Sequence, residues 1–474
     1  MRNCNDYLRS MTAENKDNTL KAAGIGNSGF GKEAETTQVH HYGRKQQSTA
    51  SQGKTLLDKI LSRENLTSAY RQVVQNKGSG GVDGISVEGL KPLLWENWSR
   101  IKQELKEGTY EPKPILRVEI EKPDGGKRKL GIPTVMDRMI QQAISRQLMN
   151  IYDRTFSKSS YAYRPGRNAH MAIRQAKRYM GSKGQYIICI DLAQFFDRVN
   201  HDRLLHRLST RIEDKQVLRL IRKYLQSGEL KDGLCSKQTE GTPQGGPLSP
   251  VLSNIVLDEL DKELERRGHR FVRYADDISI FVKSRKAAER VYESITGFIE
   301  NQMKLKVNRE KSCISTPENL ILLGHGFKKY RGGYQCCVSE KSVRRFREKV
   351  KTLTRKTSPL TLDERFEGMT QLFRGWVSYF KLCWMRDKLS RLDNWIRDRI
   401  RYCIWKSWKR IRTRIRNLMR LGLNRIDSIR WGSSRKGGWR ISKSKIMHVT
   451  VTNERLEKRG LPSLVSIYDG ITTC

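Results

Sequence analysis

Residues 271–281 read FVRYADDISIF, in which an aromatic residue, a small residue and two adjacent aspartates separate two apolar runs. The pattern predicts a hairpin of two strands over residues 270–283, with Asp276 and Asp277 exposed together at its tip. Adjacent carboxylates repel each other unless cations are present, so the pair is a candidate Mg²⁺ site. Taken alone, an Asp-Asp pair more often belongs to a solvated turn.

A second acidic segment lies upstream, where residues 187–192 read IICIDL. It predicts a buried strand over residues 186–192 that runs into Asp191. Carboxylates at the ends of neighbouring strands can meet at one pair of metal ions, which stabilises the attacking and leaving oxygens of a phosphoryl transfer. Between the two acidic segments, residues 241–250 (GTPQGGPLSP) combine glycines that allow close backbone approach with prolines that stiffen the loop.

Together, and in this order, the three segments resemble motifs A, B and C of the reverse transcriptases. The resemblance implies an α+β fold, a right-hand polymerase with antiparallel sheet in its fingers and palm and an α-helical thumb. It also implies two Mg²⁺ ions, held by Asp191, Asp276, Asp277 and the Leu192 carbonyl.

The same resemblance assigns a nucleotide pocket for deoxynucleoside triphosphates (dNTPs). Phe196 matches the aromatic residue that stacks under the sugar, where it would exclude a 2′-hydroxyl. Gln244 matches a residue that lines the pocket.

Two basic segments flank these motifs. Residues 121–130 (EKPDGGKRKL) resemble the fingers hairpin, in which Lys122 and Arg128 would hold the triphosphate. Without the other motifs, an ordinary basic hairpin would be the better interpretation. Residues 308–312 (NREKS) resemble motif D, so Lys311 is either a candidate acid for the pyrophosphate leaving group or a structural lysine.

Further blocks narrow the family. Residues 76–85 (NKGSGGVDGI) and 161–170 (YAYRPGRNAH) resemble blocks of group II intron-encoded proteins, although Ala162 stands where the family usually has glycine. The resemblance implies an RNA-directed DNA polymerase that extends a DNA primer on an RNA template. It also implies a maturase that binds group II intron RNA to assist splicing and copies it into DNA during intron mobility.

Residues 397–420 contain ten Lys and Arg against one Asp. Apolar residues recur at Ile396, Ile400, Ile404, Ile411, Ile415 and Leu418, which predicts one face of a helix. The opposite face is predicted to bind RNA phosphates, and its candidate residues are Arg401, Lys406, Lys409, Arg412 and Arg416. The alternative is a solvated helix, but such a helix would mix charges of both signs.

The polar composition of residues 1–53 predicts a disordered tail. For the rest of the chain the resemblance implies fingers and palm over residues 54–334, a thumb or maturase (X) domain over 335–424, and a DNA-binding region over 425–474 that would contact target DNA. Larger relatives continue into a Cys/His-containing HNH endonuclease, which we expect to be missing here, as in compact bacterial members.

The composition fits this interpretation. The formal net charge of +42 favours a polyanionic partner. No run of about 18 apolar residues or secretory signal is present, so we expect a cytoplasmic, nucleoid-associated or ribonucleoprotein-bound protein that does not span a membrane. The nine cysteines include no C-x-x-C pair, which argues against a zinc ribbon.

Two other functions stay open at this point. One is an RNA-binding splicing factor whose polymerase fold is a relic, and the other is a reverse transcriptase of the defence or diversity-generating type. The intact aspartates argue against the first, and the Trp- and Arg-rich region argues against the second.

Overall fold

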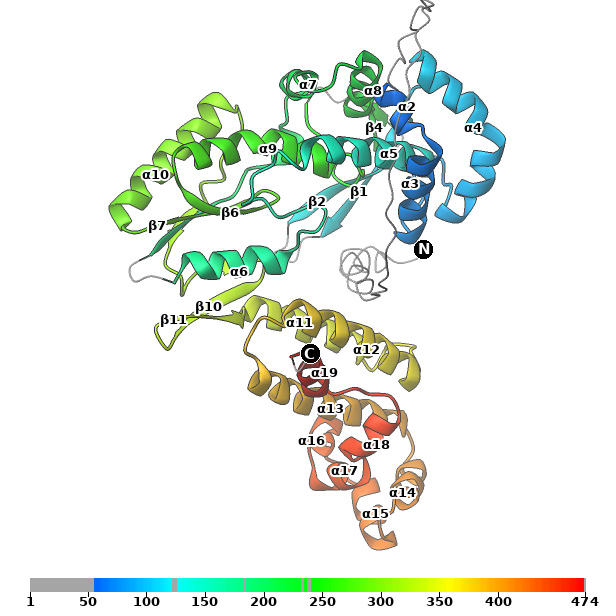
Figure 1. The fold of residues 1–474 in the computed structure, drawn as a ribbon. Helices are drawn as coiled ribbons and strands as arrows, with labels where there is room; N and C mark the ends of the chain where they lie inside the picture. Colours follow the sequence, from blue (N-terminus) through cyan, green and yellow to red (C-terminus); the bar gives the residue numbers. More distant parts are fainter. Residues whose placement is uncertain (1–54, 122–125, 182–184, 232–233, 237–239, 473–474) are drawn as a thin grey trace, which may run out of the picture.

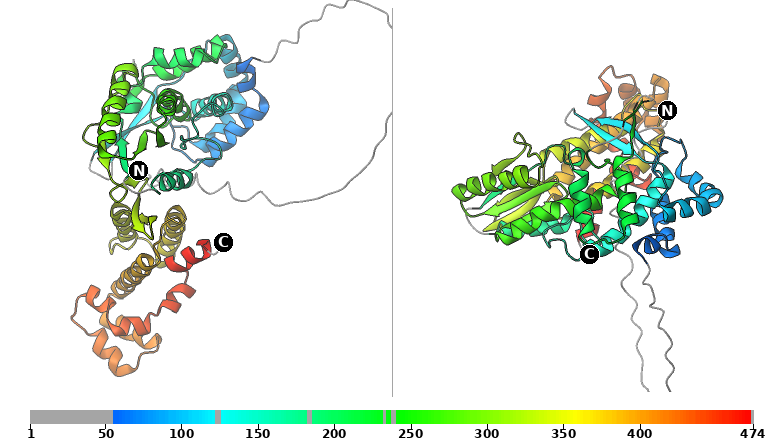
Figure 2. Two further views of the ribbon diagram at one scale, coloured as in Figure 1. Left: turned by 60° about the vertical axis from the view of Figure 1, so that its left-hand side comes forward. Right: turned by 90° about the horizontal axis from the view of Figure 1, so that it is seen from above.

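The computed structural model describes residues 55–121, 126–181, 185–231, 234–236 and 240–472. These residues form a first body of strands and helices, residues 55–338, and a helical second body, residues 340–472 (Figure 1). Figure 2 shows the second body projecting from the first. The tail expected over residues 1–53 lies outside the described residues, as does Lys122.

The N-terminal part of the first body packs helices beside a small mixed sheet. Two helices cover residues 56–75, because Ser62 begins the second one by accepting a hydrogen bond from the Asn65 N–H. The strands run in the order β2-β1-β4-β5, with β1 and β2 antiparallel as expected. The elements are α2 (Leu56–Ile60), α3 (Arg63–Gln75), η1 (Val87–Gly89), α4 (Leu90–Glu107), β1 (Ile115–Glu121), β2 (Lys127–Ile132), β4 (Glu229–Lys231) and β5 (Leu234–Ser236).

The central sheet of the first body is antiparallel, in the order β6-β7-β3-β8. Its strands are β3 (Tyr186–Ile190), β6 (Arg270–Tyr274), β7 (Asp277–Val282) and β8 (Cys313–Ser315). The helices around it are α5 (Val135–Tyr152), α6 (Ala169–Tyr179), α7 (His201–Ser209), α8 (Lys215–Gln226), α9 (Ser249–Arg266) and α10 (Arg285–Gly297), which continues into the π-helical turn η3 (Phe298–Gln302).

Both faces of this sheet are covered, which explains its nearly continuous apolar strands. Ile188 and Ile190 belong to the hydrophobic cluster that includes α9 and α10. Ile187 faces the opposite side and joins a second cluster with Ala172 of α6. Figure 1 shows α9 and α10 on one side of the strands and α6 on the other.

A three-stranded sheet and a series of helices follow. The sheet consists of β9 (Ile321–Leu322), β10 (His325–Tyr330) and β11 (Gly333–Val338). The helices are α11 (Glu340–Leu353), α12 (Leu362–Tyr379), α13 (Arg386–Ser407), α14 (Ile411–Arg420), α15 (Arg425–Gly432), α16 (Gly438–Ser442), α17 (Lys445–Thr450), α18 (Asn453–Lys458) and α19 (Leu464–Thr472).

The last helices of the chain return to the core of the second body. Asp393 of α13 accepts hydrogen bonds from the Leu464 N–H at 2.9 Å and the Ser463 hydroxyl at 2.6 Å, so it caps the start of α19. Ile441 and Leu464 lie in the same hydrophobic cluster as α12 and α13. The predicted boundary near residue 424 therefore does not separate two hydrophobic cores.

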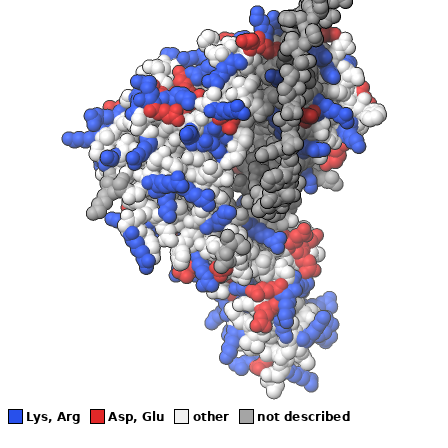
Figure 3. Space-filling view, in the orientation of Figure 1, with Lys and Arg blue, Asp and Glu red and all other residues white. Residues whose placement is uncertain are grey.

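The surface is rich in positive charge. Lys and Arg are spread over both bodies on the face shown in Figure 3, with fewer Asp and Glu among them. Among the helices that the structure describes, none combines the length and apolar character needed to span a bilayer.

Candidate active site

Two strand ends bring the predicted carboxylates to one edge of the central sheet. In the antiparallel pairing of β3 with β7, Ile190 lies opposite Ile278. Asp191 directly follows Ile190, and Asp277 directly precedes Ile278. The register therefore places Asp191 and Asp277 beside each other, as the strand-end pattern predicted.

The tip of the β6–β7 hairpin adds the third carboxylate. Tyr274 pairs with Asp277, so the chain reverses direction at Ala275 and Asp276. Ala275 has a φ of 58°, in the left-handed region that non-glycine residues seldom adopt. This conformation makes the turn tight and keeps Asp276 next to Asp277.

The electrostatics of the two hairpin aspartates agree with this convergence. Desolvation, together with the negative charges of Asp276 and Asp191, raises the pKa of Asp277 to about 6, although Lys311 opposes the rise. Desolvation also raises the pKa of Asp276, with a further upward contribution from Asp191 and an opposing one from Arg128. The cluster thus disfavours its own ionised state, a condition that a bound cation would relieve.

Residues 306–308, which lead into the segment expected to be motif D, are hydrogen-bonded to the residues that follow β3. The Asn308 N–H donates to the Asp191 carbonyl at 2.8 Å, and the Ala193 N–H donates to the Lys306 carbonyl at 2.8 Å. Neither bond uses the carbonyl of the intervening Leu192. These two bonds therefore fix the residues on either side of Leu192 without occupying its carbonyl oxygen.

The loop after β5 lies between the turn that follows β3 and the strand β2. The Thr242 N–H donates to the Phe196 carbonyl at 2.6 Å, and the Gly131 N–H donates to the Gln244 carbonyl at 2.7 Å. Gly245 has a φ of +128°, and a Cβ there would lie 2.4 Å from the Gly131 oxygen. The loop therefore requires glycine at this position to approach β2.

These contacts bring most of the predicted nucleotide-pocket residues together. Phe196 is half-buried with its ring centroid 5.3 Å from that of Phe195, and Gln244 is half-buried beside β2. Arg128 is exposed on β2, and its charge acts on Asp276. Lys311 is exposed, and its charge acts on Asp277.

The donor set fits a hard divalent cation but does not form a closed metal cage. Within the described ranges, no group of three or more His, Cys, Asp and Glu side chains has the arrangement of a complete metal site. Two or three carboxylates, a backbone carbonyl and the oxygens of a substrate are the mixed oxygen donors that Mg²⁺ usually takes. The residues present are therefore compatible with Mg²⁺ that shares its ligands with a nucleotide.

A buried arginine that the sequence motifs do not reveal supports the aspartate turn. Arg273 is 0% exposed and contacts both carboxylate oxygens of Asp261 on α9, at 2.7 and 2.6 Å. Its Nη1 also donates to Asn254 Oδ1 at 2.9 Å and to the Ala275 carbonyl at 3.1 Å. Its sign in the sequence is an arginine that follows the apolar residues Phe271 and Val272 within β6.

The predicted basic helix face needs two corrections. The helix is broken, since α13 ends at Ser407 and α14 begins at Ile411, which is 52% exposed. Arg401 was expected on the exposed face but is only 2% exposed. Its guanidinium donates to the Val451 carbonyl and to Asn453 Oδ1, because the returning C-terminal helices cover it.

The other four predicted RNA-binding residues are exposed: Lys406, Lys409, Arg412 and Arg416. Among the described residues, none of the four makes a salt bridge. Their charges are therefore available to a polyanion.

Comparison with known proteins assigns families to two parts of the chain. Residues 120–327 match the reverse transcriptase (RNA-dependent DNA polymerase) family, and residues 343–422 match the group II intron maturase-specific domain. Both matches fall where the site and the basic helices lie.

This chain is similar to two curated relatives and matches a different share of the length of each. Protein YkfC of Escherichia coli is 33% identical over 59% of this chain and 84% of its own. The group II intron-encoded protein LtrA of Lactococcus lactis is 30% identical over 56% of this chain, which spans only 55% of that relative. A solved telomerase structure from Candida albicans has a TM-score of 0.40 and is 12% identical. The match covers 74% of this chain and 69% of that one.

Proposed function

Since the chain belongs to the group II intron reverse transcriptases with a maturase-specific domain, we propose that it extends a DNA primer on intron RNA and assists the splicing of that RNA. The observation that carries the polymerase part is the convergence of Asp191, Asp276 and Asp277 at one sheet edge. Intact carboxylates there favour an active polymerase over a purely RNA-binding relic.

In this proposal the three aspartates and the Leu192 carbonyl hold two Mg²⁺ ions, which would activate the primer 3′-hydroxyl and stabilise the leaving pyrophosphate. Lys122 and Arg128 bind the triphosphate through charge-assisted hydrogen bonds. Lys311 supplies a proton to the pyrophosphate.

The remaining pocket residues select the nucleotide. The ring of Phe196 fills the space that a ribose 2′-hydroxyl would need, so that dNTPs are accepted. Gln244 lines the pocket from the loop whose backbone is bonded to β2.

The maturase part rests on the exposed cations of α13 and α14. Lys406, Lys409, Arg412 and Arg416 would bind phosphates of the intron and shift its population toward the folded ribozyme. No splicing chemistry is assigned to the protein, because binding the folded state is sufficient to favour it.

For residues 425–474 we propose contact with target DNA. Arg435, Lys436, Arg440, Lys443 and Lys445 are exposed. Two of these cations lie over indole rings, Lys436 at 5.5 Å from Trp431 and Lys443 at 4.9 Å from Trp439. Exposed cations held in place by aromatic rings suit a phosphate backbone.

Primer extension on an RNA template with Mg²⁺ and dNTPs tests the polymerase. Asp276→Ala should abolish synthesis, because it removes a proposed metal ligand, while intron RNA binding stays near the wild-type affinity. The matched control is Asp387→Ala, which removes an exposed carboxylate from α13 and should leave synthesis unchanged. Synthesis by Asp276→Ala at the wild-type rate would overturn the assignment and favour the relic.

A further inference from the structure

A hollow of about 700 Å³ lies between α6 and the tip of the β10–β11 hairpin. We call it the α6–hairpin hollow and define it by six of its lining residues: Arg174, Lys177, Arg178, Tyr330, Arg331 and Tyr334. Among the residues that the structure describes, no acidic residue lines it. The hollow therefore combines four positive charges with two aromatic rings.

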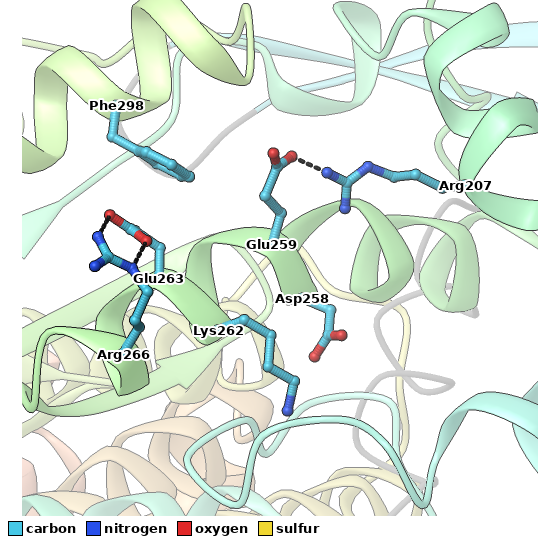
Figure 4. Close-up of a pocket in the computed structure, with 7 residues that line it drawn as sticks. All are labelled: Arg207, Asp258, Glu259, Lys262, Glu263, Arg266 and Phe298. Atoms are coloured by element: carbon cyan, nitrogen blue, oxygen red, sulfur yellow. Dashed lines mark hydrogen bonds and ion pairs between the residues drawn. The ribbon is translucent and has the colours of Figure 1, made fainter. Parts of the chain in front are cut away.

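The cations of the α6–hairpin hollow are free of acidic partners. Among the described residues, none of the four forms a salt bridge; the Arg331 guanidinium lies 5.3 Å from the Tyr330 ring. The charged hollow in Figure 4 differs, since Arg207 pairs there with Glu259 and Arg266 pairs with Glu263 at 2.7 Å. Those cations are already neutralised, whereas the cations of the α6–hairpin hollow can take an external anion.

The two tyrosines of the α6–hairpin hollow differ in how their side chains are held. Tyr330 is 52% exposed. Tyr334 is held by its hydroxyl, which donates to Glu318 Oε1 at 3.0 Å. Both residues line the hollow, one with its ring open to solvent and the other held by a hydrogen bond.

The hollow lies toward the end of the central sheet away from the aspartates. Tyr179, next to Arg178, has its ring centroid 5.4 Å from that of Phe281. Phe281 is paired with Ile187, four residues along β7 from Asp277, a separation of roughly 13 Å along the strand. A ligand in the hollow would therefore add to the contacts at the metal site without replacing them.

We propose that the α6–hairpin hollow binds a single-stranded nucleic-acid segment, with phosphates on Arg174, Lys177 and Arg178 and an unpaired base on Tyr330. Cationic grooves that carry open aromatic rings bind single strands in this way, because every base offers a face for stacking. A duplex keeps its bases inside and would leave Tyr330 unused. An acidic peptide would satisfy the cations but not the open ring.

Single strands of RNA and of DNA share this chemistry. The proposed site rests on the proposed function and adds to it a nucleic-acid contact outside the polymerase site. The probes are fluorescent oligouridylate and oligothymidylate of about 12 nucleotides, a length within the usual site sizes. Each is titrated against the full chain at several salt concentrations.

The test variant for the phosphate contacts is R174Q/K177Q/R178Q. It should flatten the plot of log affinity against log salt by about two units, since each lost contact on a single strand removes about 0.7. The matched control is K91Q/K215Q/R219Q, which removes three exposed charges from α4 and α8 and should keep the wild-type slope. Equal changes in both variants would overturn the proposal, because general charge would then explain the binding.

The stacking contact has its own variant. Tyr330→Ala should weaken binding about tenfold, whereas Trp95→Ala, which removes a ring 91% exposed on α4, should not change it. The oligonucleotide that loses more affinity in the hollow variants identifies the strand, RNA or DNA. Wild-type affinity in Tyr330→Ala would refute the stacking contact and with it the proposed site.

Failure of the polymerase proposal can be told apart from failure of this one. Asp276→Ala should lose primer extension and keep oligonucleotide binding. If the wild-type chain extends no primer while the hollow variants still lose affinity, the polymerase proposal fails and the binding site stands.

Discussion

At the residue scale, the position of Phe196 is fixed by backbone bonds from another segment. Its carbonyl accepts from the Thr242 N–H at 2.6 Å, and a Cβ at Gly241 would lie 2.9 Å from the same oxygen. The ring therefore projects from a turn that has little freedom to move. A rigid ring is what steric selection against a 2′-hydroxyl requires.

Phe196→Ala should accordingly lower the preference for dNTPs over ribonucleotides. We expect the ratio of the two kcat/KM values to fall by about 10- to 100-fold, the range usual for steric discrimination of a small group. Single-turnover incorporation of matched dNTP and ribonucleotide pairs measures this ratio. An unchanged ratio would assign the selection to another residue.

Arg273 is the second residue with a testable role. It ties the aspartate turn, through the Ala275 carbonyl, to Asp261 and Asn254 of α9. Because the ion pair is fully buried, removing one partner leaves an uncompensated charge, which destabilises proteins by about 3–5 kcal/mol. Arg273→Met should therefore lower both Tm and the primer-extension rate.

The double variant Arg273→Met with Asp261→Leu separates stability from positioning. Removing both charges should recover most of the lost Tm, since a buried ion pair and an apolar pair are often similar in stability. Extension should stay slow, because the hydrogen bond to Ala275 is still missing. Full recovery of both quantities would show that Arg273 is structural only.

Arg273 and Arg401 show where sequence reasoning stops. Asp191, Asp276 and Asp277 were predicted together because strand ends and a hairpin tip place their residues predictably. Arg273 and Arg401 are buried against partners outside their own elements, Asp261 of α9 and Val451 respectively. Periodicity identifies the faces of a helix but not the segment that later covers one of them.

At the element scale, helix breaks differ in whether the sequence reveals them. The break between α2 and α3 is marked by Ser62, an ordinary N-cap residue that is visible in the sequence. The break after Ser407 is different, because it depends on side-chain contacts of Arg414. The Arg414 Nε donates to the Trp408 carbonyl at 3.0 Å, and the Arg414 guanidinium lies 4.9 Å from the centre of the Trp405 ring. These local side-chain contacts stabilise the corner between α13 and α14. The apolar repeat continues through the corner and does not reveal it.

The exposed cations at the corner between α13 and α14 are the ones to test for intron binding. Replacing Lys406, Lys409, Arg412 and Arg416 by Gln should weaken intron RNA binding and flatten its salt dependence by about three units, at 0.7 to 0.9 per phosphate contact. Splicing assistance should fall with the affinity, and extension on a short generic duplex should fall less. Binding titrations over a range of salt concentrations give the slope.

Arg401→Gln is the internal control for this element. Because Arg401 is buried and bonded to Val451 and Asn453, its loss should lower Tm and leave the salt slope unchanged. A wild-type slope in the quadruple variant would show that the corner is only a solvated surface.

At the scale of the whole molecule, the two bodies share one hydrophobic cluster. Ile187 and Phe281 of the central sheet belong to the same cluster as Phe373 of α12 and Leu464 of α19. Residues 425–472 are therefore part of the support of the second body.

Truncation after residue 424 tests this connection. It removes Ile441, Met447 and Leu464 from the cluster and leaves Asp393 without the groups it caps. We expect a lower Tm and greater protease sensitivity of α12 and α13, together with weaker intron binding. A truncated chain of wild-type Tm would mean that residues 425–474 form a separate module, as the sequence had predicted.

The shared cluster also has a consequence for how the chain folds as it is made. The first cluster is complete once residue 307 has been synthesised, but the second needs residues as late as Tyr468. At roughly 5–20 residues per second, the interval between them lasts roughly 8–30 s. Throughout that time the face of the sheet that carries Ile187 and Phe281 lacks its final partners. A nascent chain in this interval exposes apolar surface, so chaperone demand and aggregation should be greatest before the last helix leaves the ribosome.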